Sequence, residues 1–241
     1  MSGLSIRIDS ALEHLRAALV QHTPATFACS FGMEDMVIYD LIHRHALPVT
    51  IFTLDTGRLH EETYALMDRA RERYPLPLKV MFPDRHAVEE FVAAEGINAF
   101  YRDIALRKRC CGVRKVEPLR RALAGNRLWI TGLRREQSVT RADTAFLAHD
   151  ADNGLMKLSP LLDWRESDVQ SYVTQYGVPV NALHQKGFPS IGCAPCTRAI
   201  TAGEDARAGR WWWEQPESKE CGLHVDPTGK LVRSNGTGVS A

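Results

Sequence analysis

The sequence predicts a doubly wound α/β fold, in which helices cover both faces of a mostly parallel sheet. The main observation is that apolar segments of strand length alternate with segments of helical period along the chain. A length of 241 residues suits one large α/β domain. A composition of 44% hydrophobic and 24% charged residues is that of an ordinary globular protein whose core needs no disulfide.

The first predicted element is a surface helix over residues 1–20. Its apolar residues recur at helical spacing, and Asp9 and Glu13 interrupt them, which the apolar stretch of an export signal would not tolerate. The later strands are short apolar runs, and the later helices repeat apolar residues every three to four positions. We expect strands over residues 26–31, 49–54, 78–82 and 128–132, and helices over residues 34–45, 59–74, 87–94, about 113–123 and from about 166.

The character of the sequence changes beyond Arg210. Three consecutive tryptophans, residues 211–213, precede a charged stretch and then a Gly-rich and Ser-rich end over residues 228–241. We therefore expect an α/β domain over residues 1–210 and a flexible, mobile C-terminal tail over residues 211–241.

The charge balance excludes several classes of partner. The chain has 30 basic and 29 acidic residues, and a net charge of +1 provides no overall field for nucleic acid or a membrane surface. We find no run of apolar residues long enough for a membrane span. We expect a cytoplasmic protein with a small-molecule partner, whose six cysteines bind metal or do chemistry instead of forming structural disulfides.

Three polar turns are predicted to meet at the carboxyl edge of the sheet. Residues 29–35 connect the first strand to a helix, where backbone N–H groups and the helix dipole can hold an anion. Residues 55–57 end the second strand, and residues 131–132 end the fourth. Taken alone, the first turn is better explained as a plain helix start capped by Ser30, because phosphate loops usually contain more glycine. Because three such turns share one edge, the sequence favours a ligand site there.

Four of the cysteines form two pairs that lie far apart in the sequence. Cys110 and Cys111 are adjacent, whereas two residues separate Cys193 from Cys196. Four thiolates suit zinc or an iron–sulfur cluster. From the residues alone, structural zinc is the commoner outcome and a redox disulfide is a third alternative.

Several of these segments resemble one known family. Residues 30–35 resemble the modified pyrophosphate loop of the adenine-nucleotide α-hydrolase superfamily, in its sulfonucleotide reductase branch, and residues 54–57 and 132–138 match that branch too. Phe31 stands where the ATP-cleaving members have a glycine, and a bulky residue there blocks close backbone approach to a pyrophosphate. The resemblance therefore implies that the nucleotide is already activated and that ATP is not cleaved.

Residues 220–224 closely resemble the catalytic tail of the adenylyl-sulfate and phosphoadenylyl-sulfate reductases. The resemblance implies that Cys221 attacks the sulfur of adenylyl sulfate, releases AMP and becomes an S-sulfonate. Thioredoxin or a similar dithiol protein would then release sulfite. Cys29 is poorly suited to that second step, because it ends a buried strand. The resemblance thus implies that residues 1–210 form a nucleotide-binding domain with the iron–sulfur site and that residues 211–241 form the catalytic tail.

The resemblance also assigns a cofactor and roles to single residues. The two cysteine pairs are similar to those with which assimilatory adenylyl-sulfate reductases bind one [4Fe-4S] cluster, so neither nicotinamide nor flavin is expected. Lys115 matches a lysine between cluster and substrate, although from the residues alone it reads as a solvated surface lysine. The expected catalytic residues are Cys221, His224 and Lys115; the expected cluster ligands are Cys110, Cys111, Cys193 and Cys196; the expected substrate-binding residues are Ser30, Phe31, Gly32, Asp55, Thr56, Gly57, Gly132, Arg134, Arg135, Arg207 and Arg210.

Three alternatives remain open. The nearest is a reductase for 3'-phosphoadenylyl sulfate, or for both nucleotides, although relatives that use the phosphorylated substrate generally lack the four cysteines. A tRNA-thiolating iron–sulfur enzyme of the same superfamily is more remote, because Phe31 and the net charge of +1 oppose it. A zinc-stabilised nucleotide sensor is the third, and Cys221 counts against it. For Arg134 and Arg135, two interpretations remain: they bind phosphate, or they lie at the solvent-exposed end of a helix. The sequence decides neither whether the protein forms a homo-oligomer nor what residues 211–213 do.

Overall fold

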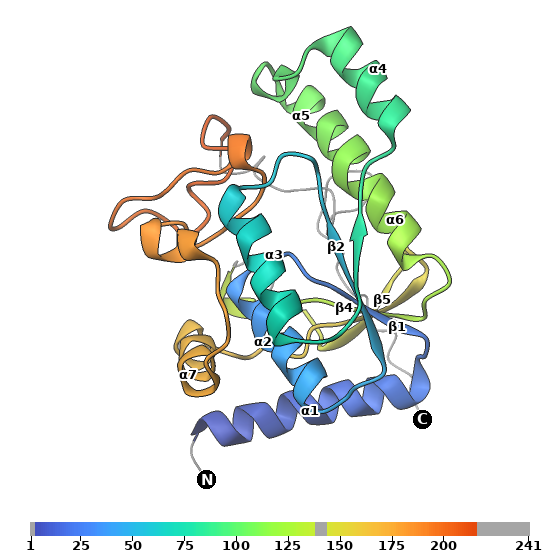
Figure 1. The fold of residues 1–241 in the computed structure, drawn as a ribbon, viewed down its shortest axis with the longest axis vertical. Coiled ribbons are helices and arrows are strands. Elements are labelled where there is room, and N and C mark those ends of the chain that lie inside the picture. Colours follow the sequence, from blue (N-terminus) through green and yellow to red (C-terminus); the bar gives the residue numbers. More distant parts are fainter. Residues whose placement is uncertain (1–2, 138–143, 216–241) are drawn as a thin grey trace.

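The computed structural model describes residues 3–137 and 144–215. Its centre is a six-stranded sheet with the strand order β3-β2-β1-β4-β6-β5 (Figure 1). Four of the neighbouring strand pairs are parallel, and β5 pairs antiparallel with β6. The predicted mostly parallel sheet is therefore confirmed. The strands are β1 (Ala25–Ala28), β2 (Val49–Leu54), β3 (Leu78–Met81), β4 (Leu128–Ile130), β5 (Leu147–Asp150) and β6 (Leu155–Leu158).

Helices cover both faces of this sheet. On one face, helices α1, α2, α3 and α7 pack around residues such as Phe27 and Ile51. On the other face, α6 packs against Phe52 and Trp129. Ile51 and Phe52 are neighbours in β2 but belong to opposite faces, as the alternation of side chains along a strand requires. The longer helices are α1 (Gly3–Gln21), α2 (Met33–Arg44), α3 (Glu61–Arg73), α4 (Arg85–Glu95), α5 (Ile104–Cys111), α6 (Glu117–Leu123) and α7 (Glu166–Tyr176).

The hairpin of β5 and β6 is absent from the sequence prediction. Each strand has only four residues, and His149 and Lys157 interrupt the apolar pattern. Such short, mixed segments carry little periodic signal. They add two strands beyond β4 at one edge of the sheet.

The helix predicted near residues 113–123 begins earlier than expected. Helix α5 runs into a π-helical segment, Gly112–Val116, and then into α6, so that the three form one helical run in Figure 1. Asp103 caps its start, because the Asp103 carboxylate accepts a hydrogen bond from the Leu106 N–H at 2.8 Å. The widened π segment directly follows the adjacent cysteine pair and contains Lys115, and such segments occur frequently at functional sites.

Packed structure continues beyond Arg210, where the sequence suggested that the domain ends. Trp211 is 1% exposed and packs beside Phe100 and the cysteines. Residues 211–214 therefore belong to the packed body, whereas residues 216–241 lie outside the described residues. Within the described part of the chain, none of the helices combines the length and the apolar character needed to span a bilayer.

Candidate active site

A cavity of about 780 Å³ lies at the carboxyl ends of β1, β2 and β4, where the three polar turns were predicted. Its volume lies within the range of small-molecule and cofactor sites. Most of the predicted residues within the described part contribute to its lining. Ser30, Gly32, Thr56, Lys115, Gly132, Arg134, Arg207 and Arg210 line the cavity, whereas Phe31, Asp55, Gly57 and Arg135 do not.

Phe31 turns away from this cavity. Its φ of +61° lies in the left-handed region that favours glycine, and its side chain is 1% exposed within the main core. The loop thus keeps a glycine-like backbone conformation, and the ring fills the core. Contrary to the expectation from the sequence, the ring does not stand between the loop backbone and the cavity, which Ser30 and Gly32 line on either side.

Asp35 stabilises the first polar turn, residues 29–35, through hydrogen bonds within the turn. Its carboxylate accepts hydrogen bonds from the N–H and the hydroxyl of Ser30, both at 2.6 Å. A Cβ atom at position 132 would lie 2.1 Å from Asp35 Oδ1, so Gly132 permits this close approach between the first and third turns. Burial raises the pKa of Asp35 to about 6, although the Ser30 hydrogen bonds act in the opposite direction. The sequence analysis did not select Asp35 as a site residue.

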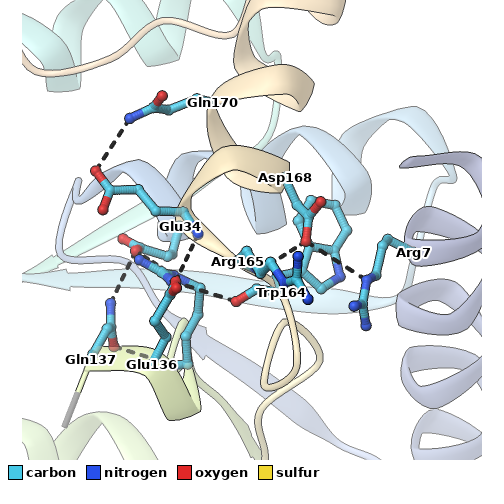
Figure 2. Close-up of polar contacts among 10 residues, drawn as sticks. Arg7, Glu34, Glu136, Gln137, Trp164, Arg165, Asp168 and Gln170 are labelled. Carbon is cyan, nitrogen blue, oxygen red and sulfur yellow. Dashed lines mark hydrogen bonds and ion pairs between the residues drawn. The ribbon is translucent and has the colours of Figure 1, made fainter. Parts of the chain in front are cut away.

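Arg134 lies at the edge of the cavity between two carboxylates. Its Nε is 2.8 Å from Glu34 Oε1, and its Nη1 is 2.7 Å from Glu136 Oε2. Figure 2 shows Glu34, Glu136 and Gln137 in this network, in which the Gln137 amide donates to Glu34 at 3.0 Å. The Arg134 side chain is 7% exposed. Its charge is therefore already compensated by protein carboxylates, and it fixes the position of Glu34 in the cavity wall.

Three further predicted residues shape the surroundings of the cavity without lining it. The Arg135 guanidinium pairs with Asp163 at 2.6 Å, which turns it away from the ligand space. The Asp55 carboxylate accepts hydrogen bonds from the Gly57 N–H at 2.7 Å and the Tyr64 hydroxyl at 2.9 Å. Gly57 has a φ of +70°, in the left-handed region that favours glycine. These contacts fix the shape of the turn that presents Thr56.

The two cysteine pairs meet in one small pocket beside the cavity. Helix α5 supplies one pair, and the segment that begins the 3₁₀ turn η6 (Ala194–Cys196) supplies the other. The cysteines that line the pocket are Cys110, Cys111, Cys193 and Cys196. None of them forms a disulfide. Within residues 3–137 and 144–215, no group of three or more His, Cys, Asp or Glu side chains is arranged to hold a single metal ion.

The environment of the four thiols is uneven. Burial is the largest influence on Cys193 and opposes its ionisation, but Lys115, the Thr56 hydroxyl and nearby arginines outweigh it and lower the pKa of the thiol. Thr56 Oγ1 lies 3.2 Å from Cys193 Sγ. Burial raises the pKa of Cys196 to about 12, and the charges of Cys193 and Cys111 add to this effect. The surroundings of Cys193 therefore favour its thiolate, whereas burial raises the pKa of Cys110 and Cys196.

Lys115 and Arg210 line both the cavity and the cysteine pocket. Arg210 is 8% exposed, and its Nη1 donates a long hydrogen bond of 3.3 Å to the Ile191 carbonyl. Its buried Nε has no hydrogen-bond partner among the described residues. A buried guanidinium with an unsatisfied N–H is costly unless an anion or another acceptor completes it. The boundary between the two pockets therefore favours an anionic ligand.

Several cations of the cysteine pocket were missed by the sequence analysis. Arg58, Arg107 and Arg114 line it, and Arg114 Nη1 donates to the Thr56 carbonyl at 2.8 Å. Arg107 precedes Cys111 by four residues and Arg114 follows it by three, so helical spacing was an available signal for both.

Of the remaining candidate residues, some lie within the described part of the chain and some lie outside it. Arg207 lines the cavity, and Cys221 and His224 lie outside the described residues. Cys29 is 2% exposed, and burial followed by the charge of Asp35 raises the pKa of its thiol well above the usual value. The expectation that Cys29 is buried at the end of its strand is confirmed.

The fold and the site define an α/β protein of the adenine-nucleotide α-hydrolase-like class, with a thiol-lined pocket beside its ligand cavity. Residues 24–199 match the family model described as the phosphoadenosine phosphosulfate reductase domain. The chain belongs to this family.

Relatives and solved structures agree with this assignment. The chain is 50% identical over 228 residues to adenosine 5'-phosphosulfate reductase of Burkholderia cepacia, covering 93% of this chain and 91% of the relative. It is 51% identical to the protein of that name from Allochromatium vinosum, covering 92% and 86%. The crystal structure of phosphoadenylyl-sulfate reductase from Candida auris superimposes with a TM-score of 0.67 at 26% identity, covering 83% of this chain and 98% of that one. FMN adenylyltransferase of Candida glabrata shares the fold alone, with a TM-score of 0.54 at 14% identity over 90% of this chain and 78% of that one.

Proposed function

We propose that this protein reduces adenylyl sulfate to sulfite and AMP in the assimilation of sulfate, with thioredoxin or a similar dithiol protein as electron donor. The observation that carries the proposal is the position of Lys115 and Arg210, which line both a nucleotide-sized cavity and a pocket of four thiols. The relatives named adenosine 5'-phosphosulfate reductase, at 50% and 51% identity, support the choice of nucleotide.

The cations of the cavity perform the electrostatic part of the reaction. A thiolate repels the oxygens of a sulfate group, so the attack requires cations that neutralise those oxygens. Lys115, Arg207 and Arg210 line the cavity and supply that charge, and His224 is expected to join them. The Cys221 thiolate then forms a bond to the sulfur, and the bond from sulfur to the phosphate oxygen breaks. AMP leaves with the electron pair of that bond, and Cys221 carries an S-sulfonate.

The release of sulfite needs a second thiol. A thiolate of the dithiol protein attacks the Cys221 sulfur, sulfite leaves with the bonding electrons, and the second thiol of the same protein resolves the mixed disulfide. The dithiol is oxidised to a disulfide and supplies two electrons. Cys29 is excluded from this role because its thiol is buried and held neutral. Thiol chemistry of this kind suits the cytoplasm, which keeps cysteines reduced.

The four cysteines of the pocket are the proposed ligands of one [4Fe-4S] cluster. The donor set fits such a group, because Cys110, Cys111, Cys193 and Cys196 line one pocket whose other lining residues include five cationic side chains. Arg58, Arg107, Arg114, Lys115 and Arg210 are these cations. When bound, the cluster supplies a compact negative charge beside Lys115. Because Lys115 lines both pockets, its positive charge would act on the cluster and on the bound sulfate together, which couples the two pockets.

Intact-mass spectrometry tests the proposal. Wild-type protein mixed with adenylyl sulfate, without dithiol, is expected to gain the mass of one SO3 group, and peptide mapping is expected to locate it on Cys221. Cys221→Ser is expected to bind adenylyl sulfate and gain no mass. Normal sulfite production by Cys221→Ser would refute the assigned nucleophile.

The 3'-phosphorylated nucleotide is the second candidate substrate. It is favoured by the solved structure from Candida auris, which is that of a phosphoadenylyl-sulfate reductase. Turnover of the two nucleotides at equal concentration separates the candidates. A higher kcat/KM for adenylyl sulfate is expected, and the opposite order would assign the protein to the other substrate.

A further inference from the structure

A buried ion pair fastens the last described residues to the helix that carries Cys110 and Cys111. Arg107 of α5 and Glu214 form two parallel hydrogen bonds, Nε to Oε1 and Nη2 to Oε2, both at 2.8 Å. The two side chains are 0% and 3% exposed. A bidentate pair that is shielded from water holds both partners in one geometry. The reaction proposed above assigns no role to Glu214 and uses Arg107 only as one of the cations that line the cysteine pocket.

The same arginine connects this anchor to the cavity. The Arg107 guanidinium lies 4.5 Å from the centre of the Trp211 ring, and the Arg210 guanidinium lies 4.7 Å from that centre. The backbone N–H of Trp211 donates to the Cys196 carbonyl at 3.1 Å. Trp211 has a φ of +41°, which a bulky residue keeps only where its surroundings impose it. A continuous row of contacting side chains thus leads to the cavity, in the order Glu214, Arg107, Trp211 and Arg210.

In the ion pair of Arg107 and Glu214, Glu214 lies only a few residues before Cys221 in the sequence, and this position indicates the function of the pair. Cys221 follows Glu214 by seven residues, which span at most about 25 Å when fully extended. Trp211 lines the cavity and precedes Glu214 by only three residues. We propose that Arg107 and Glu214 are positioning residues, which fix the start and the direction of the segment that brings Cys221 to the sulfur of the substrate. This inference rests on the proposed role of Cys221.

Chain length alone does not explain the need for such a pair. Without it, Trp211 would be the last fixed residue, and a tether longer by three residues changes the effective concentration of Cys221 by only about 2-fold. Lost direction costs more, because misplacing reacting groups by about 1 Å can slow a reaction by about 100-fold. The rate of S-sulfonate formation therefore distinguishes positioning from simple tethering.

The experiment measures S-sulfonate formation in a single turnover of the full-length, cluster-loaded protein. Glu214→Gln keeps the size of the side chain and removes its charge. We expect the rate at saturating adenylyl sulfate to fall by at least about 10-fold, while the Kd for adenylyl sulfate changes by less than about 3-fold. The visible absorption of the protein is expected to stay unchanged.

A matched control is available on the next helix. Arg121 and Glu117 form the same two-bond arrangement, at 2.5 and 3.0 Å, but their side chains are 47% and 44% exposed. Glu117→Gln removes a charge from a pair with the same two-bond pattern, and no hydrogen bond or ion pair among the described residues joins this pair to residues 211–215. Its rate is expected to equal that of the wild type.

The outcomes separate this inference from the proposed function. A rate for Glu214→Gln within about 2-fold of wild type overturns the positioning role, since tether length alone predicts that much. Equal losses of rate and of substrate affinity also overturn it. If Cys221→Ser still forms the adduct, the nucleophile is misassigned and both ideas fail; if it forms none while Glu214→Gln reacts normally, the positioning role alone fails. Should Glu214→Gln not fold, Glu214→Asp decides by the same two measurements.

Discussion

The Thr56 hydroxyl lies 3.2 Å from the Cys193 sulfur, although 137 positions separate the two residues in the chain. Thr56 lies two residues beyond the end of β2 and also lines the ligand cavity, whereas Cys193 belongs to the thiol pocket. The carbonyl of Thr56 accepts a hydrogen bond from Arg114, a second residue of that pocket. One residue at the carboxyl edge of the sheet therefore contacts the nucleotide space and the cysteines together.

Replacing Thr56 by valine is expected to weaken the binding of metal in the thiol pocket. Valine has nearly the same shape, but it cannot hydrogen-bond to the Cys193 sulfur, and the loss of such an outer contact typically lowers metal affinity by about 10-fold or more. The measurement is the rate of iron release to a chelator. Thr50→Val within β2 is the control, because the Thr50 hydroxyl bonds only to the Ala25 carbonyl among the described contacts. Equal release rates in the two variants would contradict the role of Thr56.

Gly132→Ala is expected to destabilise the protein and to weaken nucleotide binding. The added Cβ would lie 2.1 Å from the Asp35 carboxylate, which must then move away from Ser30. Forcing an extra methyl group into a packed site costs about 1–3 kcal/mol. Thermal unfolding and adenylyl sulfate titration measure the two effects. Gly3→Ala is the control, since its Cβ would meet nothing within 4 Å; a wild-type Tm for Gly132→Ala would show that Asp35 is free to shift.

Asp35 is expected to make stability depend on pH between about 4 and 6. Its pKa in the folded protein is raised from 3.8 to about 6, so the folded state binds the proton more tightly than the unfolded state. The resulting stabilisation is fully present below about pH 4 and is lost as the pH rises through 6, and its size is on the order of 2–3 kcal/mol. The measurement is the free energy of unfolding of wild type and Asp35→Asn across this range.

The informative quantity is the difference in the free energy of unfolding between wild type and Asp35→Asn. The wild type is expected to lose stability relative to Asp35→Asn as the pH rises from 4 to 6, and the difference is expected to level off above that range. Parallel curves would indicate that Asp35 titrates near its ordinary pKa when folded.

The features that the sequence predicted correctly depend on local patterns and on topology. Apolar runs located four of the five parallel strands of the described sheet, and the rule that ligands bind at the carboxyl ends of parallel strands located the cavity with Ser30, Thr56 and Gly132. The paired spacing of the cysteines also predicted one shared pocket, and the structure brings Cys110 and Cys193 into it. Each of these predictions needed only residue type and spacing along the chain.

The features that the sequence did not reveal depend on contacts between distant segments. The partner of Arg107 is Glu214, 107 positions away, and no local pattern identifies such a pair. Phe31 was placed correctly in the loop, but the side to which its ring turns is decided by core packing. The sequence also does not reveal how the neighbouring residues Arg134 and Arg135 differ. Arg134 is buried beside Glu34, 100 positions away, whereas Arg135 is partly exposed beside Asp163.

Arg134 and Arg135 are expected to behave very differently when each is replaced by methionine. Arg134→Met leaves Glu34 without its partner in the cavity wall, and breaking a buried pair costs about 3–5 kcal/mol. The pair of Arg135 with Asp163 is 33% and 44% exposed, and such a pair contributes at most about 1 kcal/mol. Arg134→Met should therefore lower the Tm strongly and weaken adenylyl sulfate binding, because an uncompensated carboxylate then faces an anionic ligand. Calorimetry and nucleotide titration of both variants check this contrast, and a larger loss of affinity in Arg135→Met would restore Arg135 as a phosphate ligand.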